Sequence, residues 1–197
     1  MKTLLVLGPL ALSFALCSCS SMLPPQAEIT KLSDEFSRPG ETAYGIVGNT
    51  LEKEKGGTSD LVEQGGIIYS RSVDLGAICA EAGESRIYSL HAHYGGPDWL
   101  FLEPGESLIL LVDGERVGLS GEGSVDHRST HAGGVSESAS FAVPPELLVK
   151  IAGAKEVKVK LQGSSGSIQR RFGKENLKIF GEFVRRFITR EEPGQDK

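Results

Sequence analysis

Long stretches of the chain alternate between apolar and polar residues, which is the pattern of β-strands with one face in a core. In the segment VDLGAICA, the side chains on one face are Val73, Leu75, Ala77 and Cys79. In RIYSLHAHY, one face carries Tyr88, Leu90, Ala92 and Tyr94. His91 and His93 fall on the opposite, polar face. Because successive side chains on a strand point to opposite sides, each segment predicts a strand with one buried face.

The segment SLILLVDGERVGLSG contains the strongest turn signal of the chain. Asp113 and Gly114 stand between two apolar runs, which predicts a β-hairpin with a two-residue turn. The first run, SLILLV, is apolar at almost every position, so we expect a central strand that is covered on both faces. Further along, EVKVKLQG alternates cleanly, and SSGS is expected to turn it into a following strand, IQRRF.

Two segments have helical periodicity instead. PPELLVKIAG combines prolines near the first turn with Leu147, Leu148 and Ile151 at helical spacing. Near the C-terminus, KENLKIFGEFVRRFITRE has basic residues on one side and an apolar stripe on the other. The stripe consists of Leu177, Phe180, Val184 and Phe187. This second helix is expected to pack on a sheet with its cations outside; contact with a membrane or partner is the alternative.

The order of these elements predicts the fold class. Strands recur at short spacing and no βαβ alternation is present, which favours antiparallel sheets. We therefore predict a mainly β protein, an antiparallel β-sandwich or open barrel, with a short helix and an amphipathic C-terminal helix. One β-rich domain is expected over residues 41–190, followed by a disordered tail at 191–197.

The N-terminus has the layout of a secretory signal. Lys2 precedes the apolar run LLVLGPLALSFAL, which gives way to small polar residues. The run is shorter than the ~20 residues that a membrane-spanning helix needs, and Gly8 and Pro9 interrupt it. A signal peptide is therefore favoured over a transmembrane anchor.

The end of this run, Leu16-Cys17-Ser18-Cys19, resembles the lipobox of bacterial lipoproteins. The resemblance implies that residues 1–18 are a signal peptide and that Cys19 becomes the lipidated first residue. Placing Cys17 in that role instead puts the bulky Leu16 before it, which fits less well. Residues 19–40 are then expected to form a flexible tether. With Ser20 after Cys19, the family pattern implies the outer membrane, on its periplasmic face, in a Gram-negative cell.

This interpretation determines what the three cysteines can do. Cys17 leaves with the signal peptide and Cys19 carries lipid, so Cys79 remains alone, and we expect no internal disulfide. Its inward position beside Leu75 and Ala77 predicts a buried thiol. Cleavage after Ala15 would instead make a Cys19–Cys79 bridge possible.

Composition and charge limit the classes of protein to which the chain can belong. The chain is 39% hydrophobic and 24% charged, which is typical of a globular protein. The net charge is −5, yet residues 150–197 contain 12 of the 21 Lys and Arg and only 6 of the 26 acids. A basic C-terminal part on an acidic whole does not support nucleic-acid binding.

The histidines are the candidate metal ligands. His91 and His93 point the same way on one strand, and His127 and His131 share a Gly- and Ser-rich loop. If the two pairs met, they could bind zinc or copper. The simpler interpretation is that the strand pair lies on a solvated face.

Other chemistry is weakly indicated. Trp99 follows GGPD and is expected in the core, although it could line a groove for carbohydrate or peptide. No nucleophile elbow, phosphate loop or zinc-protease motif is present, so no catalytic residue and no cofactor are predicted.

We expect a non-enzymatic binding or assembly module, attached to the membrane through lipid on Cys19, with an envelope protein as possible partner. The alternative is a metal-binding or hydrolytic protein that uses the four histidines.

Overall fold

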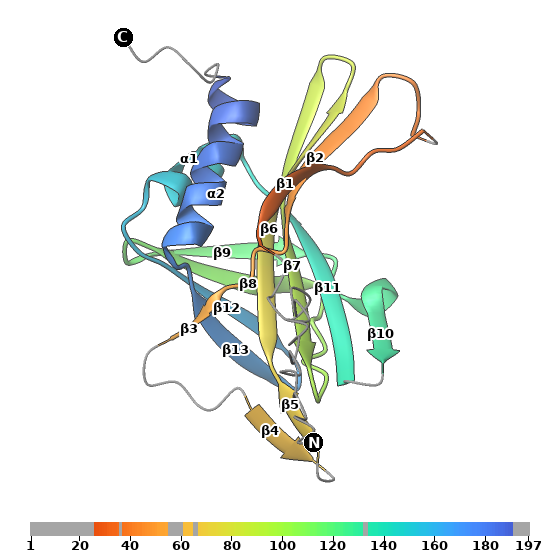
Figure 1. The fold of residues 1–197 in the computed structure, drawn as a ribbon, viewed down its shortest axis with the longest axis vertical. Helices are drawn as coiled ribbons and strands as arrows, with labels where there is room; N and C mark the ends of the chain where they lie inside the picture. The colour runs from red at the N-terminus through yellow and green to blue at the C-terminus, as the bar shows by residue number, and fades with distance from the viewer. Residues whose placement is uncertain (1–25, 36, 55–60, 65–66, 132–133, 191–197) are drawn as a thin grey trace, which may run out of the picture.

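The structure is a computed structural model that describes residues 26–35, 37–54, 61–64, 67–131 and 134–190. Within these ranges it contains two large antiparallel sheets, a small hairpin and two helices (Figure 1). Neither large sheet closes on itself over the described ranges, so the predicted mainly β fold is confirmed in its sandwich form.

The first sheet has six strands in the order β1-β2-β6-β7-β11-β10. Their bounds are β1 Glu28–Lys31, β2 Glu41–Val47, β6 Ser72–Ala82, β7 Ser85–Gly96, β11 Gly134–Ala142 and β10 Arg128–His131. The long β6–β7 hairpin forms its middle. The alternation seen in the sequence has the expected result, because Leu75, Leu90 and Ala92 are fully buried between the sheets.

The second sheet has five strands in the order β3-β13-β12-β8-β9. Their bounds are β3 Glu52–Lys53, β13 Gly166–Arg171, β12 Val157–Gly163, β8 Gly105–Val112 and β9 Glu115–Gly121. A separate hairpin consists of β4 Leu61–Gln64 and β5 Ile67–Ser70. The predicted turn between β8 and β9 is confirmed: Asp113 and Gly114 both have positive φ, at 50° and 86°, as a two-residue hairpin turn requires.

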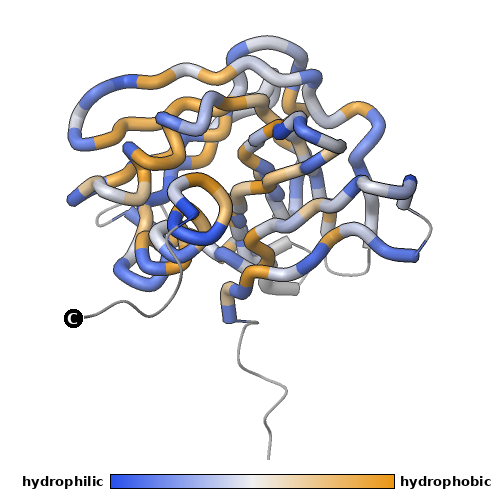
Figure 2. The backbone as a smooth tube through the Cα atoms, turned by 90° about the horizontal axis from the view of Figure 1, so that it is seen from above, coloured by the Kyte–Doolittle hydropathy of each residue, from blue (hydrophilic) through white to orange (hydrophobic). Residues whose placement is uncertain are grey.

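The two large sheets pack face to face and their strands cross steeply (Figure 1). One continuous core fills the space between them, with Leu108, Leu110 and Leu161 of the second sheet fully buried against the first. Along the backbone, hydrophobic segments concentrate in the strands and hydrophilic ones at the chain reversals (Figure 2). Burial of apolar area is the main force that holds the two sheets together.

The two helices lie together beside the sandwich. α1 spans Pro145–Gly153 and α2 spans Lys174–Val184, continued by one π-helical turn, η3, at Arg185–Thr189. Phe180 and Phe183 are fully buried, and the ring of Phe187 stacks on Tyr44 of β2 at 4.8 Å between centroids. The apolar stripe of the C-terminal helix therefore packs on the domain, as its periodicity predicted. No helix in the described part of the chain has the length and hydropathy needed to cross a bilayer.

Two expectations about strands require correction. Residues 28–31, assigned to the tether, form β1 and pair with β2 from Glu28↔Val47 to Lys31↔Tyr44. The run SLILLV in β8 is not covered on both sides, because β8 lies next to the edge strand β9 and Leu111 is 38% exposed. In the pairing of β12 with β8, Lys158 lies opposite Leu111 and Lys160 lies opposite Ile109. Residues 1–25 and 191–197 lie outside the described ranges.

Candidate functional site

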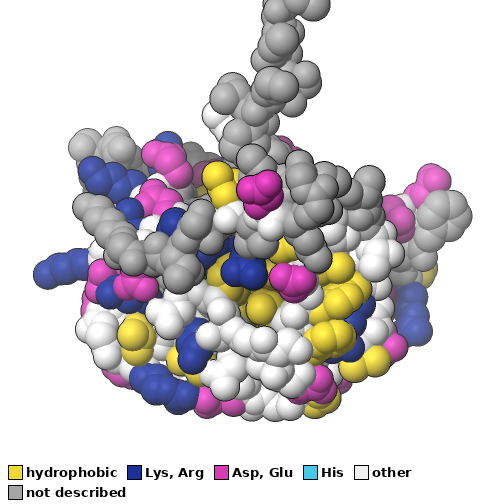
Figure 3. Space-filling model, turned by 90° about the horizontal axis from the view of Figure 1, so that it is seen from below, with side chains coloured by type: hydrophobic (Ala, Val, Ile, Leu, Met, Phe, Trp, Pro, Cys, Tyr) yellow, Lys and Arg dark blue, Asp and Glu magenta, His cyan; other side chains and the backbone are white. Residues whose placement is uncertain are grey.

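A cleft of about 870 Å³ opens where the two sheets diverge, at the end of the sandwich that carries the β12–β13 turn. Its walls come from segments that are distant in sequence: the connection between β5 and β6, the end of β7 and the loop that follows it, β11, β13 and β3. Apolar side chains lie beside basic and acidic ones on this end of the molecule (Figure 3). The side chains that the following paragraphs use are Lys53, Arg71, Tyr94, Asp98, Leu100, Ile168 and Arg170.

One buried carboxylate, Glu137 of β11, positions the loop that forms the cleft wall. Its Oε1 accepts hydrogen bonds from the backbone N–H groups of Leu100 at 2.6 Å and Phe101 at 2.9 Å. Its Oε2 accepts from the N–H of Leu102 at 3.0 Å and from Ser124 Oγ at 2.7 Å. These four donors are held by a side chain with no exposed surface, so the loop has a rigid attachment to the core.

The ionised form of Glu137 is the one that this environment favours. Burial alone would raise the pKa of its carboxyl, but the hydrogen bonds from Ser124 and from the three backbone N–H groups outweigh burial and lower the pKa below its ordinary value. Arg128 adds a guanidinium nitrogen 3.6 Å from Oε2. Both oxygens are thus occupied by structural contacts, which assigns Glu137 to support of the wall rather than to contact with a ligand.

The β12–β13 turn is attached to the same loop. The backbone N–H groups of Ser164 and Ser165 donate to the carbonyls of Phe101 and Leu100, each at 3.1 Å. This close approach requires glycine at position 163, since a Cβ there would lie 2.0 Å from the Leu100 oxygen. Phe101 has a positive φ of 55°, so the loop holds an unusual backbone conformation next to the cleft. The two walls therefore form one continuous, hydrogen-bonded rim.

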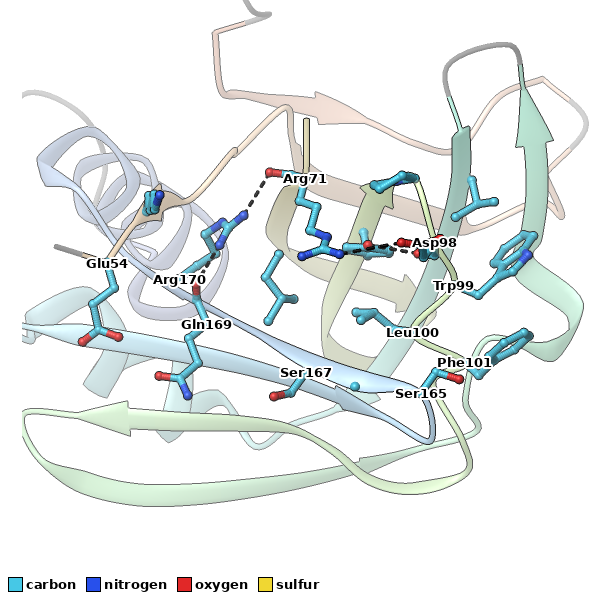
Figure 4. Close-up of a pocket in the computed structure, with 16 residues that line it drawn as sticks. Glu54, Arg71, Asp98, Trp99, Leu100, Phe101, Ser165, Ser167, Gln169 and Arg170 are labelled. Carbon is cyan, nitrogen blue, oxygen red and sulfur yellow. Dashed lines mark hydrogen bonds and ion pairs between the residues drawn. The ribbon is translucent and has the colours of Figure 1, made fainter. Parts of the chain in front are cut away.

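Two arginines face the interior of the cleft from opposite walls (Figure 4). Arg71 Nη2 lies 3.7 Å from Asp98 Oδ2. Arg170 is only 4% exposed, and its Nη2 donates to the Arg71 carbonyl at 2.9 Å while its Nη1 donates to the Gln169 carbonyl at 2.8 Å. Tyr94 OH donates to the Asp98 carbonyl at 3.0 Å, and burial raises the pKa of this phenol. Arg170 is consequently held in place by backbone carbonyls, whereas Arg71 has a longer contact with a carboxylate that is largely exposed.

The structure brings His127 near His91, whereas the side chains of His91 and His93 do not converge. His91 Nδ1 lies 3.0 Å from Ser140 Oγ on β11, whereas His93 Nδ1 lies 3.6 Å from Asp74 Oδ2 on β6. The two imidazoles therefore turn toward opposite neighbouring strands. Burial lowers the pKa of His91, and the nearby His93 and His127 lower it further. The side chain of His131 lies outside the described structure.

No group of three or more His, Cys, Asp and Glu side chains could hold a metal ion in the described part of the chain. On the same polar face, Asp74 accepts a hydrogen bond from Thr50 Oγ1 at 2.5 Å. Burial alone would raise the pKa of Asp74, but its bonds with His93 and Thr50 outweigh burial and lower the pKa. The carboxylate that contacts His93 is thus also engaged by Thr50.

Cys79 is an ordinary packing residue, whereas Trp99 both packs on the core and lines the cleft. Cys79 is completely buried, as predicted, and burial raises the pKa of its thiol. Trp99 is partly buried against the core, with its ring 6.0 Å from that of Phe101. Trp99 and Phe101 also line the cleft, on the side away from Arg170 (Figure 4). Cys17 and Cys19 lie outside the described ranges.

Glu137 and Arg170 belong to no recognised motif, but the sequence contains a signal for both. In VSESASFAV, Glu137 falls on the same face as Val135, Ala139 and Phe141, so a charge stands at an inward position. Arg170 likewise shares the inward face of β13 with Ile168. Charged residues on the buried face of a strand need a partner, and such positions are candidate site residues.

No protein-family model matches the chain, and no curated protein or solved structure matches it either. The geometry and charge of the cleft are therefore the basis for a functional assignment.

Proposed function

We propose that the protein is a lipid-anchored lipoprotein of the cell envelope that acts as a binding module, with the cleft between its two sheets as the binding site. The observation that carries the proposal is a cleft of about 870 Å³ with fixed walls, since ligand sites are concave and largely pre-formed, and the mainly polar lining of this one suits a polar ligand. The lipobox supports the location, with Cys19 as the attachment point.

The chemistry of the walls supports binding rather than bond breaking. Glu137, the carboxylate in the best-shielded position, accepts four hydrogen bonds from the loop and from Ser124. The guanidinium of Arg170 is bonded to the carbonyls of Arg71 and Gln169. Groups that are committed to wall structure in this way give a pre-organised site, which reduces the entropy lost on binding.

Site-directed photo-crosslinking in envelope membranes tests this proposal without knowledge of the ligand. Ser167→Cys places an exposed thiol at the cleft, whereas Ser120→Cys places one on β9, at the far side of the same sheet. Each full-length variant is labelled with a benzophenone maleimide and irradiated. We expect adducts from position 167 that position 120 does not give. Identical adducts from both positions, or none from position 167, would contradict the cleft as the binding site.

A further inference from the structure

One strand beside the cleft has an edge that is open over the residues that the structure describes. β13 pairs with β12 along its whole length, from Gly163↔Gly166 to Lys158↔Arg171. On its other side, β3 reaches only Arg170 and Arg171. Within the described ranges, Gly166–Gln169 therefore have no neighbouring strand on that side, and residues 164–167 and 169 are exposed. Unpaired backbone groups at a strand edge can accept a further strand.

The register of the hairpin shows which backbone groups face this edge. The β12–β13 turn has two residues, Ser164 and Ser165, so the flanking Gly163 and Gly166 exchange hydrogen bonds with each other. The pattern alternates along the strand, which directs the N–H and C=O groups of Ser167 and Gln169 to the open side. In agreement, the Gln169 carbonyl accepts a bond from Arg170 Nη1 rather than from β12.

The positive charge of the cleft lies at one end of this edge. Arg170 Nη2 donates to the Arg71 carbonyl, so Arg71 lies next to the end of β13 (Figure 4). The side chain of Arg71 is 34% exposed, and its contact with Asp98 is 3.7 Å. Ionised donors and acceptors in strong pairs are about 2.7–2.9 Å apart, so this contact is loose and can be exchanged for another carboxylate.

The other charged side chains in the cleft leave its electrostatic potential positive. Lys53 also lines the cleft, whereas the acidic Glu54 is engaged by Lys158 Nζ at 3.0 Å. Asp98, the remaining acid among the described lining residues, has a side chain that is 63% exposed and can turn toward solvent. An incoming carboxylate therefore meets a net cationic surface that attracts it before contact.

We infer that the cleft binds an extended acidic peptide segment of a partner protein, which adds as a strand to the open edge of β13 and places a carboxylate at Arg71. Alternate side chains of such a peptide would point into the cleft, against Leu100, Ile168 and Arg71, and the others would point to solvent. This inference rests on the binding role proposed above and names the chemistry of the partner.

The first test concerns charge. The full-length lipidated protein in detergent is titrated with a fluorescein-labelled peptide that alternates threonine and glutamate, and with its threonine–lysine counterpart. We expect the glutamate peptide alone to bind, and Arg71→Gln to weaken it by about tenfold or more. Arg116→Gln is the matched control, because Arg116 pairs with Glu106 on the outer face of the five-stranded sheet that contains β13. Equal loss in both variants, or equal binding of both peptides, would overturn the inference.

The second test concerns the strand edge. Ser167→Pro removes one edge N–H, and Ser167→Ala removes only the hydroxyl. We expect binding to fall in the proline variant and to persist in the alanine variant, with the melting temperature of each recorded to verify folding. If Ser167→Pro does not fold, Gln169→Pro removes the next edge donor.

The outcomes separate this inference from the proposed function. Binding of inorganic phosphate that depends on Arg71, together with unchanged peptide binding in a folded proline variant, would show an oxyanion site and refute strand addition. Crosslinks from position 167 without binding of the glutamate peptide would refute the acidic partner while the cleft still stands as a binding site.

Discussion

The strongest prediction concerns Glu137, because one side chain holds three consecutive backbone N–H groups of the cleft wall. Glu137→Gln keeps the shape but leaves only one oxygen, so two of the four donors face an amide NH₂ that cannot accept from them. Hydrogen bonds to charged groups contribute about 1.5–3 kcal/mol each, so we expect the variant to lose about 3–6 kcal/mol of unfolding free energy.

The pH dependence has a defined sign. Because the folded-state pKa of Glu137 lies below its ordinary value of 4.5, the stability that it contributes is fully present above pH 4.5 and is lost as the pH falls through the folded pKa. The stability difference between wild type and Glu137→Gln should therefore be largest near neutral pH and should shrink in acid.

Urea unfolding at a series of pH values measures this difference, and hydrogen exchange at the Leu100, Phe101 and Leu102 amides reports on the loop itself. Glu122→Gln is the control, since it removes the same charge from an exposed position in the same part of the chain. A Glu137→Gln variant as stable as this control, or a difference that stays constant from neutral to acid pH, would refute an ionised carboxylate as the anchor of the loop.

Three further predictions follow from the fold and the sequence. Phe183→Ala should lower the unfolding free energy by about 3–5 kcal/mol, because Phe183 is fully buried; a loss below 1 kcal/mol (well under this range) in urea unfolding would contradict the packing of α2. Cys19→Ala should abolish sedimentation with membranes whereas Cys17→Ala should not, and a Cys19 variant that still pellets would refute the lipid anchor. The Cys79 thiol should resist a thiol reagent at neutral pH until denaturant is added, since burial raises its pKa; rapid labelling of the folded protein would show that the site opens.

The sequence could predict what depends on local periodicity. The inward positions of β6 and β7, the turn at Asp113 and Gly114, and the apolar stripe of α2 each follow from side-chain spacing within a few residues. Where the prediction from side-chain spacing was wrong, the element depends on a contact with a residue outside its own segment. β1 was assigned to a tether because its four residues, EITK, have no clear period until they pair with β2.

The cleft could not be predicted because no single segment contains it. Arg71, Asp98 and Arg170 meet only after the sheets have formed, and the three backbone partners of Glu137 lie 35 to 37 positions away in the chain. A period-two pattern shows that Glu137 faces inward but does not show what it meets there. The same limit applies to the histidines: His91 and His93 share a face by spacing, but spacing does not show that each side chain turns to a different neighbouring strand.

The position of β1 also changes how far the domain can stand from the membrane. A tether from Cys19 to residue 40 could span about 70 Å, at about 3.4 Å for each extended residue, whereas a chain that enters the sheet at Glu28 spans at most about 30 Å. With lipid on Cys19, the domain would remain within about one domain diameter of the bilayer. If the proposed lipid anchor and acidic partner are both correct, we expect the partner to be an envelope protein whose acidic segment lies close to the membrane. Lengthening the segment before Glu28 should therefore extend the set of crosslinked partners without changing affinity for the glutamate peptide.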